Sequence, residues 1–149
     1  TGYAILEKRK HAAKPDVKEY GCITTTAKTP LPERLSILAK DLRKIIKKYK
    51  PEELAVEKLF FAKNVKTGIA VGQARGVILL LGAENKLQIS EYSPAEVKQA
   101  VSGYGQAPKE QVQRMIKAIL KLEKIPHPDD AADAIAIGLC HLQTNHQLK

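Results

Sequence analysis

The stretch Leu54–Phe60 reads LAVEKLF, a short apolar run that carries one glutamate, Glu57. Its length and composition predict a strand over residues 54–59. Apolar residues at helical spacing flank this strand on both sides, at residues 30–49 and 65–84. A strand that stands between two helices in the sequence predicts a sheet covered by helices, which is an α/β architecture.

The rest of the chain extends this alternation. Ser93 and Glu96 have the spacing of a capping box, and Pro94 occupies the first helical position, so a helix is expected from there to about Val101. Further expected elements are strands at residues 2–8, 18–25 and 87–91, and helices at residues 108–122 and 129–145. The first two strands predict a hairpin. We therefore expect one α/β domain over residues 1–149, a mixed sheet flanked by helices.

The charge of the chain narrows the class of its partner. Lys and Arg number 25 against 16 Asp and Glu, a formal net charge of +9, which favours an acidic polymer such as nucleic acid. The longest apolar run, Gly76–Ala83, is too short to span a bilayer, and the first residues do not resemble a signal peptide. Two distant cysteines, Cys22 and Cys140, indicate neither a zinc site nor a disulfide scaffold. These features predict a cytoplasmic protein without a membrane partner.

Glu57 is the first candidate for chemistry. An exposed glutamate near the end of an edge strand is ordinary, and taken alone this residue needs no function. Its position argues for one, because α/β proteins place their sites at the carboxyl ends of sheet strands.

Three acids, Asp129, Asp130 and Asp133, open the last predicted helix. Asp130 and Asp133 are three residues apart, which places their Cβ atoms about 5–6 Å apart on one face. An acid at a helix N-terminus stabilises the helix dipole, but one acid would meet that need. Two carboxylates this close repel each other unless a cation is near, and oxygen ligands alone favour Mg²⁺ or Mn²⁺. The pair therefore fits a metal site and a charged helix end equally well.

Both phenylalanines of the chain, Phe60 and Phe61, fall in the polar segment that follows the Glu57 strand. They are explained either as packing anchors of a loop or as a platform on which bases stack. We expect one ring to anchor the loop and the other to reach a substrate. Lys63 and Lys66 would then contact phosphates beside it.

Lys98 and Lys109 stand at the two ends of a loop that contains Gly103 and Gly105. A lysine at each end of a glycine loop suits contact with a phosphate backbone. Each lysine taken alone is an ordinary solvated charge.

In this order, the segments resemble the RuvC-type Holliday junction resolvases, the crossover junction endodeoxyribonucleases. Residues 55–64, AVEKLFFAKN, look like the second acidic motif and the junction-engaging loop of that family. Residues 72–76, GQARG, are similar to its central-helix motif, and residues 130–134, DAADA, resemble its last acidic motif. Residues 97–99 and Lys109 look like its basic DNA-contact positions. The resemblance spans nearly the whole chain, and the ordered combination is specific although no single piece is.

The resemblance implies a ribonuclease H-like fold and paired incisions across a four-way DNA junction. It implies that Glu57, Asp130 and Asp133 are catalytic carboxylates that bind metal, expected to be two Mg²⁺ ions with Mn²⁺ as the substitute. It also implies that Phe60 stacks at the opened centre of the junction, which leaves Phe61 as the anchor.

The partners follow from the same resemblance. It implies a homodimer in the bacterial cytoplasm, whose interface holds the helix with Gly72 and Gly76, where small residues permit close packing. It also implies a branch-migration helicase complex as a further partner.

The beginning of the chain departs from the pattern of the family. The family starts with a strand that ends in an aspartate followed by Pro-Gly, and that aspartate is a metal ligand. This chain begins at Thr1, just after that point, and Asp16 and Asp41 lie in the wrong elements to replace the aspartate. We therefore expect a first strand that the given sequence does not include.

These observations predict a structure-selective endonuclease that resolves four-way junctions in recombination and repair by two-metal hydrolysis of phosphodiester bonds. Three alternatives stay open. The chain could bind junctions without cleaving them, it could be another ribonuclease H-like nuclease that acts on RNA–DNA hybrids or flaps, or its acids could only cap a helix.

Overall fold

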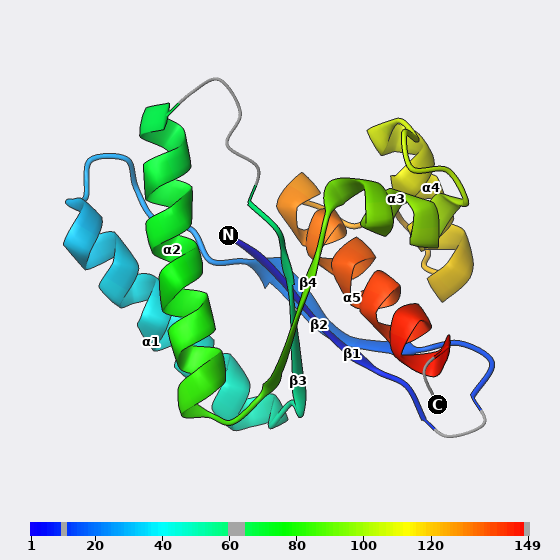
Figure 1. Cartoon of the computed structure of the whole chain (residues 1–149), viewed down its shortest axis with the longest axis horizontal. Coiled ribbons are helices and arrows are strands. Elements are labelled where there is room, and N and C mark those ends of the chain that lie inside the picture. Colours follow the sequence, from blue (N-terminus) through cyan, green and yellow to red (C-terminus); the bar gives the residue numbers. More distant parts are fainter. Residues whose placement is uncertain (10–11, 60–64, 148–149) are drawn as a thin grey trace. The chain divides into compact units, whose positions relative to one another are not determined.

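The computed structural model describes residues 1–9, 12–59 and 65–147 of the chain, in four strands and five helices within those residues (Figure 1). In chain order the elements are β1 (Gly2–Glu7), β2 (Asp16–Cys22), α1 (Leu31–Tyr49), β3 (Glu53–Glu57), α2 (Val65–Glu84), β4 (Gln88–Tyr92), α3 (Pro94–Ser102), α4 (Lys109–Leu120) and α5 (Asp129–Gln147). They form two compact units. One unit contains Thr1–Cys22, Ala55–Glu57 and Glu91–Lys149, and the other contains Ile23–Leu54 and Lys58–Ser90.

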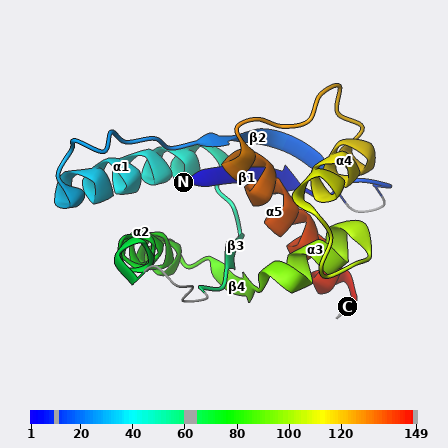
Figure 2. The same ribbon diagram turned by 90° about the horizontal axis from the view of Figure 1, so that it is seen from above.

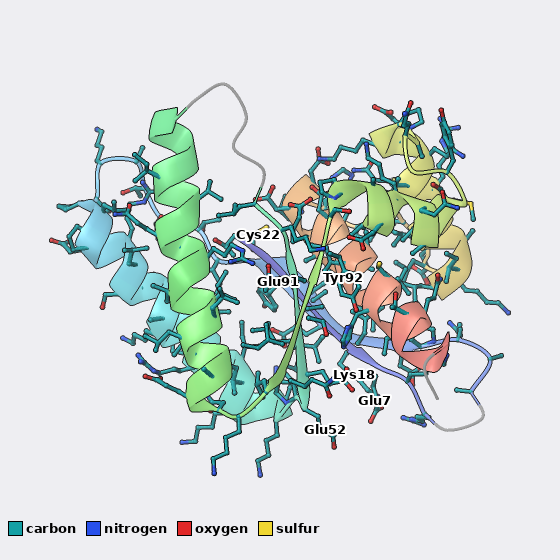
Figure 3. The ribbon with its side chains drawn as sticks, viewed as in Figure 1. Glu7, Lys18, Cys22, Glu52, Glu91 and Tyr92 are labelled. Carbon is teal, nitrogen blue, oxygen red and sulfur yellow. The ribbon has the colours of Figure 1, made fainter. Side chains whose placement is uncertain are left out.

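The hairpin of the first unit is formed by β1 and β2, which pair antiparallel. Ile5 lies opposite Glu19 and Leu6 lies opposite Val17, so the register shifts between Ile5 and Leu6. The shift is a bulge that leaves Lys18 as the extra residue of β2. Its ammonium lies 2.7 Å from the Glu7 carboxylate, and the two side chains meet across the hairpin (Figure 3).

Helix α5 covers one face of this hairpin, and α3 and α4 pack against α5 (Figure 2). The contact between α5 and β1 is close, since a Cβ at Gly138 would lie 3.0 Å from a methyl carbon of Leu6. The apolar side chains buried among these helices form one core: Tyr92, Val97, Val101, Ala107, Val112, Ile116, Leu120, Ile135, Ala136, Leu139 and Cys140. This packing fixes the N-terminus of α5 beside the start of β1.

A buried polar pair crosses the same core. Tyr92 lies at the end of β4 (Figure 3). Its hydroxyl lies 2.8 Å from Nδ1 of His141 in α5, and the two rings meet edge to face. A histidine buried in an apolar core needs a hydrogen-bond partner, as buried polar groups generally do. The pair therefore ties the end of β4 to α5.

In the second unit α1 packs along α2, and Leu38 of α1 and Leu81 of α2 are buried. Helix α1 ends where Lys50 adopts a left-handed backbone conformation, with φ of 46°, and its N–H donates to the carbonyl of Ile46 at 2.8 Å. β3 pairs with β4.

The alternation of strands and helices confirms the predicted α/β class. Within the described residues the strands pair two by two, β1 with β2 and β3 with β4. Helix α2 has the expected bounds, whereas α4 ends at Leu120 because Lys121 is left-handed, with φ of 53°. The expected domain boundaries, residues 1–149, stay a prediction. No helix among the described residues is both long and apolar enough to cross a membrane.

Candidate active site

The first turns of α5 present their acids outward because their alanines are buried. Ala131 and Ala132 have no exposed surface, and Ile135 is equally buried one turn later. Helical spacing then places Asp129, Asp130 and Asp133 on the outer side, where all three are exposed. The small apolar residues thus anchor the helix while leaving room around the carboxylates.

Glu57 ends β3 and faces Asp133. Val56 beside it is buried, so the alternation of the strand turns Glu57 away from that side. The residue is exposed, yet the protein around its carboxylate removes enough water to raise the pKa of Glu57. The negative charge of Asp133 raises this pKa further. Two carboxylates from different elements therefore interact, as the predicted site requires.

Lys109, a predicted DNA contact, lies beside the acids of α5. It begins α4, and its Nζ donates toward Asp129 at 3.2 Å and toward Asp133 at 3.4 Å. The bond to Asp129 is the main reason that the pKa of Lys109 is raised. Gln113, one turn along α4, donates to the other oxygen of Asp129 at 3.1 Å. Lys109 and Gln113 together lower the pKa of Asp129.

Asp130 points toward the start of β1. Its carboxylate lies 4.0 Å from the backbone nitrogen of Thr1. A Cβ at Gly2 would collide with the backbone carbonyl of Asp130, so this close approach requires glycine. Asp130 therefore contacts the start of β1, whereas Asp133 contacts Lys109 of α4.

The described side chains include no group of three or more acids, histidines or cysteines close enough to hold a metal ion. What the structure brings together is the pair of Glu57 and Asp133, with Asp130 one turn away on the same helix. The chemistry of these donors still suits a hard divalent ion, because all are carboxylates. A cation would also remove the repulsion between Glu57 and Asp133.

The glycine loop that joins α3 to α4 carries the second predicted lysine. The expected capping box is confirmed: the Ser93 hydroxyl accepts from the Glu96 N–H at 3.2 Å, and the Glu96 carboxylate accepts from the Ser93 N–H at 2.6 Å. Helix α3 ends at Gly103, whose φ of 74° favours glycine. Lys98 is half-buried on α3, and Tyr104 in the loop is 55% exposed.

The remaining predicted DNA contacts cannot be placed. Phe60 and Lys63 lie outside the described residues, as does the anchor Phe61. Lys66 lies in α2, but its side chain is also outside the described part. Their roles stay predictions.

Sequence reasoning did not assign a site role to Asp129 or Gln113. Asp129 belongs to the acidic run, but the sequence prediction rests on Asp130 and Asp133, which are three residues apart. The signal for Asp129 was its four-residue distance from Asp133, which also places two residues on one helix face. No sequence signal identified Gln113, because its contact depends on how α4 packs against α5.

The comparisons with known proteins agree on one protein family. The family model described as crossover junction endodeoxyribonuclease RuvC matches residues 1–141. The protein of that name from Halothermothrix orenii is 58% identical over 140 residues, which cover 94% of this chain and 84% of the relative. Its counterpart in Finegoldia magna is 52% identical over 141 residues, covering 95% and 85% of the two chains.

Solved structures agree with the sequence comparisons. The structure of Thermus thermophilus RuvC superposes with a TM-score of 0.89 at 31% identity, covering 98% of this chain and 89% of that one. The structure of T. thermophilus RuvC in complex with a Holliday junction substrate gives a TM-score of 0.91 at 32% identity, covering 98% and 88%. These likenesses confirm the predicted ribonuclease H-like fold.

Proposed function

The chain belongs to the RuvC family of crossover junction endodeoxyribonucleases, and we propose that it resolves four-way DNA junctions by metal-dependent hydrolysis of phosphodiester bonds. The observation that carries this proposal is the meeting of Glu57 and Asp133. Burial and the charge of Asp133 raise the pKa of Glu57, which is the electrostatic mark of acids gathered at a functional site.

Membership in the family implies a divalent metal ion, and the more specific proposal is two Mg²⁺ ions held by Glu57, Asp133 and Asp130. Bound Mg²⁺ would supply the charge that activates water and stabilises the leaving oxygen in hydrolysis of this kind. The chain itself supplies the oxygen ligands from β3 and α5. Mn²⁺ prefers the same ligands and would substitute.

DNA binding follows from the charge of the chain. A net charge of +9 attracts a phosphate backbone, and Lys98 and Lys109 lie in the same unit as the acids. Phe60, Lys63 and Lys66 stay proposed contacts from the resemblance, with Phe60 stacking at the centre of the junction. Binding should weaken steeply as the salt concentration rises.

A homodimer is the proposed assembly, because two symmetric sites would match two symmetric strands at a crossover. One face of α2 supports it: Ile69 is 56% exposed and Leu80 is 55% exposed. Gly72 and Gly76 fall between them at helical spacing, and a Cβ at Gly76 would meet nothing within 4 Å. A branch-migration helicase and the bacterial cytoplasm complete the proposed setting.

The decisive experiment compares cleavage of a synthetic four-way junction, a linear duplex and an RNA–DNA hybrid with Mg²⁺. It uses this chain and a second version extended before Thr1 by the strand ending in Asp-Pro-Gly that the resemblance implies. We expect the junction to be cleaved selectively, and Glu57→Gln to abolish cleavage while junction binding is retained. Glu53→Gln, which neutralises another acid of β3, is the matched control and should cleave normally.

The other outcomes identify the alternatives. Binding of the junction without cleavage by either version would replace the enzyme with a junction-binding protein. Equal cleavage of the hybrid would indicate a different ribonuclease H-like nuclease. Normal cleavage by the Glu57→Gln variant would contradict the proposed role of this carboxylate.

A further inference from the structure

Asp129 stands beside the proposed active site without belonging to its ligand set. One of its oxygens lies 3.2 Å from Nζ of Lys109, and the other accepts from Gln113 at 3.1 Å. Lys109 and Gln113 are four residues apart on α4, so they reach Asp129 from one face of that helix. Both carboxylate oxygens of Asp129 therefore bind side chains of α4, which hold Asp129 in place.

Stability does not explain this arrangement. Ion pairs between exposed side chains contribute little to folding, and Asp129 and Lys109 are about half exposed, at 56% and 45%. Stabilising the dipole of α5 would need only an acid in its first turn, with no partner on α4. What the contacts do determine is the position of the Lys109 ammonium, which also lies 3.4 Å from Asp133.

Asp133 thus has two neighbours of opposite effect. The carboxylate of Glu57 carries the same charge and repels it, whereas the ammonium of Lys109, 3.4 Å away, attracts it. A divalent ion held by Glu57 and Asp133 would take over the attraction to Asp133. Asp129, which is not one of those two ligands, would keep its own bond to Lys109.

We propose that Asp129, steadied by Gln113, is a positioning residue that holds the Lys109 ammonium beside the active site before and after metal binding. Without metal, Lys109 is the counter-ion of Asp133. With metal, Asp129 retains Lys109 where it can contact a phosphate of the DNA. This inference rests on the proposed function, because it assigns Asp133 to the metal.

The test is a double-mutant cycle of Asp129→Asn and Lys109→Gln, with Glu110→Gln as the matched control. Glu110 is an exposed acid next to Lys109 in α4 and takes no part in the site. Mg²⁺ affinity is measured by calorimetry on the protein without DNA, and single-turnover junction cleavage is measured against Mg²⁺ concentration in whichever version of the chain cleaves.

In Asp129→Asn, Lys109 loses its bond to Asp129 and keeps the one to Asp133. It then competes more strongly with the metal for the Asp133 carboxylate. We expect Mg²⁺ affinity and cleavage at saturating Mg²⁺ each to fall about tenfold, the lower end of the range for residues that support metal ligands. In Lys109→Gln, Mg²⁺ affinity should rise instead. Adding Asp129→Asn to Lys109→Gln should then change little, because the two residues act as one unit.

Additive effects in the cycle would overturn the proposal, since Asp129 would then act only through its charge. So would an Asp129→Asn variant that matches Glu110→Gln. Nuclear magnetic resonance of ¹⁵N-labelled lysine gives a readout that needs neither metal nor cleavage. The Lys109 ammonium signal should be visible in the unmodified chain and should shift in Asp129→Asn, because Lys109 loses its bond to Asp129 and keeps the one to Asp133. If that result holds while neither chain version cleaves, the proposed function fails and the positioning stands.

Discussion

The start of α5 and the end of α1 are both charged helix ends, and both carry the sign that the helix dipole favours. The acidic end is Asp129, Asp130 and Asp133, and the basic end is Lys47, Lys48 and Lys50. At the acidic end, the charges contact other elements: Lys109 of α4 bridges two of them, and Glu57 of β3 faces one. Charges at this end are thus arranged by tertiary packing.

The basic end is arranged differently. It borders an open hollow of about 620 Å³ in the second unit, lined by basic, acidic, amide and apolar side chains. Arg43 in that lining pairs with Glu84 at 3.7 Å, and the ammonium of Lys48 lies 4.6 Å from the centre of the ring of its neighbour Tyr49. A run of like charges at a helix end is therefore weak evidence of a site, whereas charges from separate elements that perturb one another are strong evidence.

The largest expected effect tests this difference on catalysis. Asp133→Asn should lower the single-turnover rate of junction cleavage by about three orders of magnitude, because a proposed metal ligand is lost. Lys47→Gln should change the rate by less than about twofold, since surface phosphate contacts mainly affect binding. Cleavage assays at saturating Mg²⁺ measure both variants. A comparable loss in the two would remove the distinction between the helix ends.

The next effect concerns the packing that supports each end. Ile135 in α5 has no exposed surface, whereas Ile37 in α1 is 38% exposed. Ile135→Ala should lower the free energy of unfolding by about 2–5 kcal/mol, and Ile37→Ala should change it by about 0.5 kcal/mol or less. Urea unfolding measures both. Equal losses would show that α5 is not anchored more firmly than α1.

Local patterns predicted most of the fold. The helical spacing of residues 65–84 matches α2, and the capping box at Ser93 is formed as expected. Errors arose at element ends: β2 spans Asp16–Cys22 rather than residues 18–25, and α4 ends early at Lys121. A lysine in the left-handed conformation is uncommon, so no residue-type signal marked that end.

The site was predicted less completely than the fold. Glu57 and Asp133 are predicted from their residue types and positions, and in the structure burial and the charge of Asp133 raise the pKa of Glu57. Their role as ligands stays a prediction. Spacing along α5 predicts Asp130 as a ligand beside Asp133, and this stays a prediction. The contact with Lys109, which Asp129 shares with Asp133, was not predicted. That outcome depends on how α4 packs on α5, which no local pattern encodes.

A smaller effect tests the basic end itself. Lys50 ends α1 with φ of 46°, a conformation that costs a residue with a side chain about 1 kcal/mol. Lys50→Gly should therefore raise the free energy of unfolding by somewhat less than about 1 kcal/mol, because the lost charge forfeits a few tenths. Lys48→Gly, inside the same last turn, is the control and should lower it by about 1 kcal/mol. Thermal unfolding distinguishes the two signs.

The smallest effect is the pH dependence at the acidic end. The pKa of Glu57 is raised above its usual value of 4.5 by burial and by Asp133, so the folded chain binds this proton more tightly than the unfolded chain. Stability from this residue is therefore present at low pH and is lost as the pH rises from about 4.5 through the raised pKa. Glu57→Gln removes the titration. Without metal, the variant should become more stable than the unmodified chain across this interval and keep a constant advantage above it.

The advantage should be small, because water screens an exposed carboxylate. Added Mg²⁺ should reverse it, since the ion binds the folded chain with Glu57 and stabilises it by mass action. Urea unfolding at a series of pH values, with chelator and then with Mg²⁺, measures both effects. The contrary result is a free energy of unfolding of Glu57→Gln that differs from that of the unmodified chain by the same amount at every pH. That result would show that Glu57 and Asp133 do not repel each other in solution. The acidic end of α5 would then be linked to α4 through Lys109 but not to β3 through Glu57.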